Sequence, residues 1–80
     1  MLSVCMIVKD EAANLPHILA SIRGVADEII VVDTGSTDET MEIAKSAGAR
    51  VFEFPWCDDF SAARNYSLDQ ATGDMVLWLD

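Results

Sequence analysis

The sequence predicts a single parallel α/β domain in which strands and helices alternate along the chain. Three observations support this prediction. Apolar runs of strand length occur four times, segments with helical features lie between them, and 80 residues leave room for one domain at most. Such alternation places the strands in a parallel sheet with helices packed on its faces, joined by right-handed crossovers.

The four strand candidates are short apolar runs without a regular alternation of polar residues. Strands that are covered on both faces by helices have this composition. The candidates are residues 2–8, 28–32, 50–54 and 75–79.

The first helix is predicted from a single apolar stripe. Leu15, Ile18, Leu19 and Ile22 follow the i, i+3, i+4, i+7 spacing of one helical face. Asn14 can cap this helix, and Gly24 can end it.

The second helix is predicted from its start and its end. Residues 36–39 (Ser-Thr-Asp-Glu) fit the capping-box pattern S/T-x-x-E, and Gly48 suits the left-handed position after the last turn. A third helix is predicted at about residues 60–71, with Asp59 or Ser61 as its cap and Gly73 as its end.

The charge and the apolar pattern exclude several classes of partner. The formal net charge is −9, with 5 basic and 14 acidic residues, so the chain lacks the basic footprint that nucleic acids or anionic membranes require. No apolar run approaches the roughly 20 residues of a membrane helix, and the first residues do not form a signal peptide. Cys5 and Cys57, with His17 as the one histidine, make a zinc site improbable. We expect two free thiols in a reducing compartment, with a disulfide as the alternative.

Acidic residues follow the predicted strands. Ligands of open parallel sheets bind beyond the carboxyl ends of the strands. Glu11, Asp33, Asp58 or Asp59, and Asp80 are therefore expected on one rim. Crowded carboxylates repel one another, and a divalent cation or a hydroxyl-rich ligand relieves that repulsion. The pattern favours a site for a sugar, a ribose or a metal–phosphate complex.

Each of these residues also has a simpler interpretation. Asp33 precedes Thr-Gly and could serve only to begin a turn. Arg64 has the geometry to bind phosphate, but a surface ion pair with Asp58 or Asp59 explains it equally well. Neither G-x-G-x-x-G nor G-x-x-x-x-G-K-[ST] occurs, which argues against a dinucleotide-binding oxidoreductase and a P-loop NTPase.

Taken together, four segments resemble the family 2 glycosyltransferases with the GT-A fold. The resemblance covers essentially the whole chain, and it points to the branch that contains lipopolysaccharide-core β-glucosyltransferases and sublancin-type peptide glycosyltransferases. It implies a Rossmann-like, three-layer α/β/α arrangement with strand order 3-2-1-4, the N-terminal half of a GT-A fold. The segments are residues 3–11, 27–38, 63–65 and 73–80, and residues 56–61 fit the same branch.

The resemblance also implies roles for individual residues. Ile7, Lys9 and Glu11 would line the pocket for the nucleotide base and ribose, and Asp33 would bind the uracil ring. Arg64 would approach the diphosphate. Asp80 would be the first Asp of a D-x-D motif that contacts the ribose and the metal region; the second Asp would fall at position 82, and the general base also lies beyond residue 80.

The activity implied is transfer of a hexosyl group from a UDP-sugar, with inversion, assisted by Mg²⁺ or Mn²⁺. The acceptor would be a saccharide, a lipid-linked glycan or a peptide. The resemblance implies a cytoplasmic protein, with the inner-membrane surface as an alternative location for the longer protein. We expect residues 1–80 to be the donor-binding portion, truncated before the acceptor-binding half and inactive alone. An exposed sheet edge next to residues 75–79 would favour a homodimer.

Two other classes remain open at this point. A nucleotidyltransferase on a related fold would normally carry a glycine-rich, basic signature after the first strand, where Lys9-Asp10-Glu11 stands here. A receiver-like or flavodoxin-like Mg²⁺-binding module would suit the acidic strand ends, but it leaves residues 56–60 unexplained.

Overall fold

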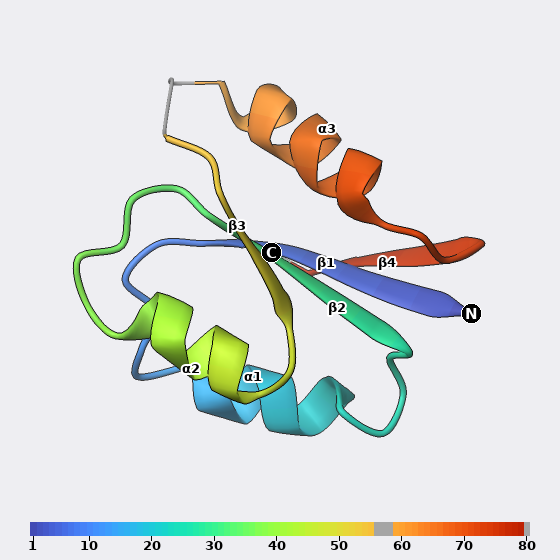
Figure 1. The fold of residues 1–80 in the computed structure, drawn as a ribbon, viewed down its shortest axis with the longest axis horizontal. Coiled ribbons are helices and arrows are strands. Elements are labelled where there is room, and N and C mark those ends of the chain that lie inside the picture. The colour runs from blue at the N-terminus through green and yellow to red at the C-terminus, as the bar shows by residue number, and fades with distance from the viewer. Residues whose placement is uncertain (56–58, 80) are drawn as a thin grey trace.

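The computed structural model describes residues 1–55 and 59–79, and it has the alternating order of strands and helices that the sequence predicts (Figure 1). All four strands are parallel and form one sheet in the order β3-β2-β1-β4. In chain order the elements are β1 (Leu2–Val8), α1 (Leu15–Ile22), β2 (Glu28–Asp33), α2 (Thr40–Ser46), β3 (Arg50–Glu53), α3 (Phe60–Gln70) and β4 (Met75–Leu79).

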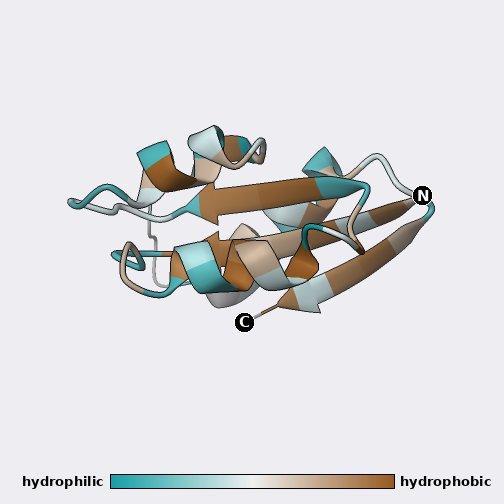
Figure 2. Cartoon of the chain, turned by 90° about the horizontal axis from the view of Figure 1, so that it is seen from below, coloured by the Kyte–Doolittle hydropathy of each residue, from teal (hydrophilic) through white to brown (hydrophobic). Residues whose placement is uncertain are grey.

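The helices cover both faces of the sheet, which gives the predicted three layers. Figure 1 shows α1 and α2 on one side of the strands and α3 on the other. Hydrophobic colour runs along the strands in Figure 2, whereas hydrophilic colour collects in loops and on parts of the helices. Because β1 lies between β2 and β4 and is covered on both faces, its run from Ser3 to Met6 is buried.

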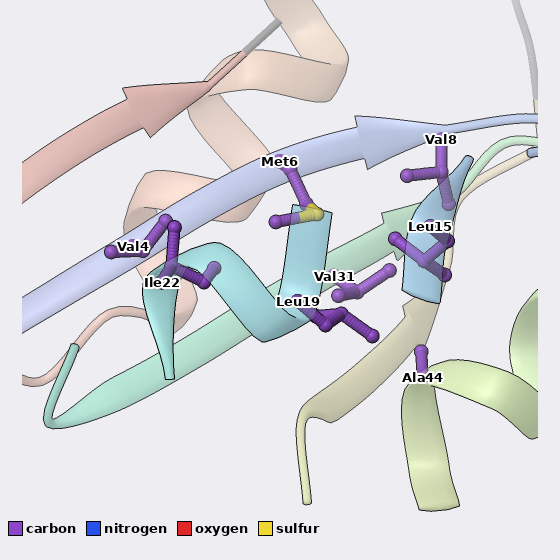
Figure 3. Close-up of a cluster of buried hydrophobic side chains, with 8 residues drawn as sticks. All are labelled: Val4, Met6, Val8, Leu15, Leu19, Ile22, Val31 and Ala44. Atoms are coloured by element: carbon purple, nitrogen blue, oxygen red, sulfur yellow. The ribbon is translucent and has the colours of Figure 1, made fainter. Parts of the chain in front are cut away.

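The larger core cluster lies between the sheet and the helices α1 and α2 (Figure 3). Alternate residues of β1 meet the predicted apolar stripe of α1, as the period of two in a strand requires. The buried members of the cluster are Val4, Met6, Val8, Leu15, Leu19, Ile22, Val31 and Ala44.

The smaller cluster lies under α3. Cys5, Ile30 and Val32 are fully buried there, and Tyr66 of α3 packs against them. Cys5 is a free thiol, as predicted. Burial is the main cause of its raised pKa, and the nearby negative charge of Glu28 raises that pKa further. Cys57 lies outside the described residues.

The predicted helix ends are confirmed in part. The Asp59 side chain accepts a hydrogen bond from Ala62 N at 3.1 Å and caps α3, and Gly48 has the left-handed φ of +86°. Asn14 is the N-cap residue of α1, but its side chain makes no capping hydrogen bond. The α1 helix ends at Ile22, before Gly24, which is not left-handed.

The predicted capping box at the start of α2 is wrong. The helix begins at Thr40, and its N-cap residue, Glu39, makes no capping hydrogen bond through its side chain. The hydroxyl of Ser36 accepts instead from Asp10 N at 2.8 Å, 26 residues away. A distant backbone amide has taken the place of the local partner.

Strand β4 pairs with β1 on one side only among the described strands. Its first three side chains are well exposed, with 66% for Met75 and 44% each for Val76 and Leu77. This confirms the exposed apolar edge, and a homodimer through that edge stays a prediction.

One carboxylate joins the amino ends of the strands. The two oxygens of Glu28 accept hydrogen bonds from the hydroxyl of Ser3 at 2.8 Å, from the amide and hydroxyl of Thr72 at 2.9 Å each, and from Arg50 Nη1 at 3.0 Å. Glu28 therefore holds β1, β3 and the loop before β4 against β2. The Thr72 amide contributes most to lowering the pKa of Glu28 from 4.5 to about 2; the hydroxyls of Ser3 and Thr72 and the Arg50 guanidinium add to it.

The close packing at the amino ends of the strands also requires a glycine at position 73. Gly73 N donates to Ser3 Oγ at 2.9 Å. A Cβ at this position would lie 2.6 Å from Ser3 Oγ and 2.7 Å from the Met1 carbonyl oxygen. Because one of those atoms belongs to the backbone, the chain itself would have to move.

The Glu28→Gln substitution is expected to lower the free energy of unfolding at pH 7 by about 2 kcal/mol, because the charge-assisted hydrogen bonds are lost. The folded-state pKa lies below the unfolded value, so this stabilisation is complete above about pH 4.5 and disappears as the pH falls toward 2. Denaturant unfolding at several pH values measures both effects. Glu42→Gln, at an exposed position of α2, should change stability by less than about 0.5 kcal/mol. If the free energy of unfolding fell equally between pH 4.5 and 2 in wild type and in Glu28→Gln, the loss could not be assigned to the Glu28 carboxylate.

Gly73→Ala is expected to destabilise the protein by about 1–3 kcal/mol, because the added methyl group overlaps Ser3 and the Met1 carbonyl. Gly24→Ala is the matched control, since a Cβ there meets no atom within 4 Å and its φ is not positive. Thermal unfolding of both variants measures the difference. Equal melting temperatures would show that the close approach is not constraining.

Candidate functional site

The candidate site lies where β1 and β2 end side by side. Val8, the last residue of β1, is the register partner of Asp33, the last residue of β2. Figure 1 shows the loops that leave these two strands next to one another, at the edge of the sheet away from the N-terminus. The loops that carry Glu11 and Asp33 therefore begin side by side, and the convergence of their carboxylates in one site stays a prediction.

Asp33 is buried, with 3% of its surface exposed, and its two carboxylate oxygens differ. Oδ1 accepts from Gly35 N at 2.9 Å and from Ser36 N at 2.7 Å, which fixes a tight turn that Gly35 enters with a φ of +125°. Oδ2 has no hydrogen-bond partner, and it is the one such buried side-chain atom among the described residues. Asp33 thus begins a turn, as its simpler interpretation holds, and also keeps one oxygen unused.

The residues around Asp33 leave space for a ligand. A cavity of about 300 Å³ is lined by Asp33, Ser36, Met41, Glu53 and Pro55, together with Thr34 and Gly35. A carboxylate oxygen only accepts hydrogen bonds, so a group that uses Oδ2 must donate. The imide N–H of a pyrimidine and the hydroxyls of a sugar have that property.

Three consecutive amides of the loop after β1 are held by side chains that follow β2, two from its loop and one from the first residue of α2. Asp10 N donates to Ser36 Oγ at 2.8 Å, Glu11 N to Thr40 Oγ1 at 2.9 Å, and Ala12 N to Asp38 Oδ2 at 3.3 Å. We call Ser36, Asp38 and Thr40 the amide-binding triplet. Thr40 is fully buried, and its hydroxyl also donates to Asp38 Oδ1.

Asp10 completes the connection in the opposite direction. Its Oδ1 accepts from Thr37 N at 2.7 Å, and its backbone has a φ of +52°. Left-handed conformations are unfavourable for residues other than glycine, although Asp and Asn tolerate them best. The two loops therefore form one hydrogen-bonded unit.

This unit leaves few backbone amides for a phosphate group. Of the amides of residues 34–37, the first donates to the Val8 carbonyl, the next two to Asp33 Oδ1 and the last to Asp10 Oδ1. The amides of residues 10–12 donate to the amide-binding triplet. At the start of α1, the amides of Asn14 and Leu15 donate to the Glu11 carbonyl. Glycine-rich phosphate loops depend on free amides at such positions. A diphosphate at this rim must be neutralised by cations instead.

The other residues predicted for the site lie on two sides of the sheet. Ile7 packs against the cluster under α3, and Arg64 of α3 places its guanidinium 4.9 Å from the centre of the Trp78 ring. Lys9 is exposed on the loop after β1. Glu11 lines a cavity of about 350 Å³ on the side of α1, and its carboxylate accepts from Asn14 Nδ2 at 3.2 Å.

Some residues with predicted roles lie outside the described part of the chain. They are Asp80 and the residues of the segment 56–58, which includes Asp58. In residues 1–55 and 59–79, no group of three or more His, Cys, Asp or Glu side chains is placed to hold a metal ion. No helix in the described part of the chain is long and apolar enough to cross a membrane.

The sequence pattern alone does not identify the amide-binding triplet as part of the site. The capping-box pattern of residues 36–39 predicts Ser36 as a helix cap and assigns no site role to Asp38 or Thr40. The available signal is the alternate spacing of short polar side chains at positions 36, 38 and 40, directly after the turn at Asp33. The hydroxyl of Thr40 contributes most to lowering the pKa of Asp38, followed by the amides of Thr40 and Ala12.

Comparison with known sequences gives a family match over nearly the whole chain. Residues 3–80 match the profile described as "Glycosyl transferase family 2". The chain is 56% identical over 78 residues to a TPR repeat-containing protein of Synechococcus elongatus, covering 98% of this chain and 19% of that protein. It is 35% identical over 79 residues to an uncharacterized glycosyltransferase of Rickettsia prowazekii, covering 99% and 27%. It is 34% identical over 83 residues to the glycosyltransferase SunS of Bacillus subtilis, covering 94% and 18%. The chain thus spans less than a third of the length of these relatives.

Comparison with solved structures gives the same fold. The chain is similar to glucosyl-3-phosphoglycerate synthase from Mycobacterium tuberculosis in complex with Mn²⁺, UDP and glucosyl-3-phosphoglycerate, with a TM-score of 0.85 and 32% identity, covering 100% of this chain and 33% of that one. The same synthase is known in complex with Mn²⁺, UDP-glucose and phosphoglyceric acid.

Proposed function

The chain belongs to glycosyl transferase family 2, and on that premise we propose that it forms the donor-binding part of a glycosyltransferase that uses a UDP-sugar. The single observation that carries this proposal is that buried Asp33, whose Oδ2 has no hydrogen-bond partner, is among the residues that line a cavity at the carboxyl ends of the strands. The acceptor-binding part and the general base belong, in this proposal, to regions of the longer protein outside these 80 residues.

The proposed role of Asp33 follows from its hydrogen bonds. A buried polar atom without a partner costs free energy, and a ligand that donates to it recovers that cost. The imide N–H of uracil is such a donor, and the complexes of the mycobacterial synthase with UDP support this choice of base. Ile7 and Lys9 flank Val8, the register partner of Asp33, and would form one wall of the base and ribose pocket, with Glu11 further along the same loop.

The proposed way of binding the diphosphate follows from the hydrogen bonds that the loop amides already make within the chain. With a net charge of −9 and few free loop amides, the chain needs added positive charge to hold an anion. We propose Arg64 as one source and Mg²⁺ or Mn²⁺ as the other, and the Mn²⁺ complex of the similar synthase supports the cation. The described residues do not assemble a metal site alone, so the cation would use oxygens of the diphosphate and residues such as Asp80.

The reaction proposed for the longer protein is a single displacement with inversion. An acceptor hydroxyl, or a thiol if the acceptor is a peptide, forms a new bond to C1 of the sugar while the bond from C1 to the UDP oxygen breaks. The acceptor proton passes to the general base. A divalent cation supplies stabilisation of the charge that develops on the leaving diphosphate. Residues 1–80 contribute binding and orientation of the nucleotide.

Asp33→Asn is expected to weaken binding of both uridine and UDP by about tenfold or more, because one charge-assisted hydrogen bond is lost and an NH₂ group faces the ligand. The amide can still accept from Gly35 and Ser36, so the turn is retained. Calorimetric titration with uridine, and with UDP plus Mn²⁺, measures the change. Asp69→Asn, at an exposed position of α3, is the control and should bind normally. Affinity of Asp33→Asn within twofold of wild type would contradict the proposal.

Arg64→Gln is expected to weaken UDP binding several-fold and to leave uridine binding unchanged. The reason is that the guanidinium is proposed to approach only the diphosphate, which uridine lacks. Arg64→Lys separates charge from stacking on Trp78, since it retains the charge. Arg23→Gln, at the exposed end of α1, removes an equal charge and should affect neither ligand. An equal loss for uridine and UDP would assign Arg64 a packing role instead.

A further inference from the structure

The amide-binding triplet connects the loop after β1 to the loop after β2 at every residue from 10 to 12. A loop with free amides samples many conformations, and fixing each residue costs conformational entropy. Here three successive residues are already fixed by side chains of a neighbouring segment. The cost of ordering this loop is therefore met during folding.

The triplet is also joined to Asp33. Ser36 donates its amide to Asp33 Oδ1 at 2.7 Å and accepts from Asp10 N at 2.8 Å through its hydroxyl. Ser36 thus connects the loop after β1 to the turn that orients the Asp33 carboxylate. The loop that carries Lys9 and Glu11 and the buried acceptor Asp33 are joined by hydrogen bonds through this one residue.

Asp38 occupies the central position in this arrangement. Its Oδ1 accepts from Thr40 N at 2.9 Å and from the Thr40 hydroxyl, while its Oδ2 accepts from Ala12 N. The same Thr40 hydroxyl accepts from Glu11 N at 2.9 Å. Asp38 therefore orients the hydroxyl that holds one amide and itself holds the next.

We propose that Asp38 and Thr40 are positioning residues for nucleotide binding: without touching the ligand, they fix the loop that carries Lys9 and Glu11 relative to Asp33. This proposal rests on the proposed function, because the ligand in question is the uridine nucleotide. It adds that affinity depends on a pre-ordered loop, which lowers the entropy lost on binding.

Asp38→Ala tests the proposal, with Glu39→Ala as its matched control. Both residues are exposed carboxylates of the same loop, so the two variants change the net charge equally, but the Glu39 side chain makes no capping hydrogen bond. Amide hydrogen exchange of the intact protein without ligand is expected to accelerate at least tenfold at Glu11 and Ala12 in Asp38→Ala only. Titration with UDP and Mn²⁺ is expected to show a five- to tenfold weaker Kd in Asp38→Ala and no change in Glu39→Ala.

A second pair of variants separates the hydroxyl from the packing of Thr40. Thr40→Val keeps the shape and removes the hydroxyl, whereas Thr40→Ser keeps the hydroxyl. We expect Thr40→Val to reproduce the exchange and affinity changes of Asp38→Ala, and Thr40→Ser to restore both to within about twofold of wild type. Glu28→Gln lowers stability at the opposite edge of the sheet, so its UDP affinity shows what destabilisation alone does.

The outcomes separate this proposal from the proposed function. If the wild-type protein binds UDP and Asp38→Ala binds it equally well, the positioning role is overturned and the proposed function stands. Unchanged exchange at Glu11 and Ala12 in Asp38→Ala overturns the ordering of the loop by the triplet. If Glu28→Gln weakens UDP as much as Asp38→Ala, the effect is one of stability and the proposal fails. Failure of the wild type to bind UDP overturns the proposed function, and the positioning role with it.

Discussion

The carboxylate of Glu28 is the interaction on which the arrangement of the sheet depends. It is fixed at the start of β2 and receives four hydrogen bonds from three other segments, including the loop that leads into the edge strand β4. The register of paired strands is set by their hydrophobic pattern and their connections, and side-chain contacts between strands add to it. At the amino ends of β1, β2 and β3, Glu28 adds side-chain hydrogen bonds to a register in which Val8 faces Asp33 at the carboxyl ends.

The polar groups at the amino ends of the strands and those at the carboxyl ends differ in how completely they are hydrogen-bonded. At the amino edge the Glu28 carboxylate is fully satisfied, which stabilises the fold and leaves nothing for a ligand. At the carboxyl ends the amides of residues 10–12 and 34–37 have partners within the chain, yet Oδ2 of Asp33 is the one buried polar side-chain atom of the described residues that has none. Buried acceptors without a partner are rare in folded proteins, and a ligand that donates a hydrogen bond would satisfy this one. The network around it gives that acceptor a defined direction.

The fold was predictable from the sequence because its signals are local. The bounds of β1 and β4 agree with the predicted ranges, and the order 3-2-1-4 and the three layers follow the family resemblance, which the family match confirms. The site was predictable only in outline. The capping pattern at residues 36–39 is a local signal, but the amides of residues 10–12 compete for the same side chains, and that contact exists only after the sheet has formed. The placement of Arg64 on Trp78 likewise depends on α3 crossing the sheet, which spacing along the chain does not reveal.

The close approach of Gly73 to β1 has a consequence for how such sequences diverge. Gly73 N donates to the Ser3 hydroxyl, and that hydroxyl donates to Glu28, so the three positions form one steric and hydrogen-bonding group across 70 residues of chain. A side chain at position 73 would displace the hydroxyl that Glu28 accepts from, and a larger residue at position 3 would have the same effect from the other side. Substitutions at positions 3, 28 and 73 should therefore accumulate together among homologues. Positions 3, 28 and 73 together offer an evolutionary marker for the entry of β4 into the sheet that is independent of every residue proposed to bind nucleotide.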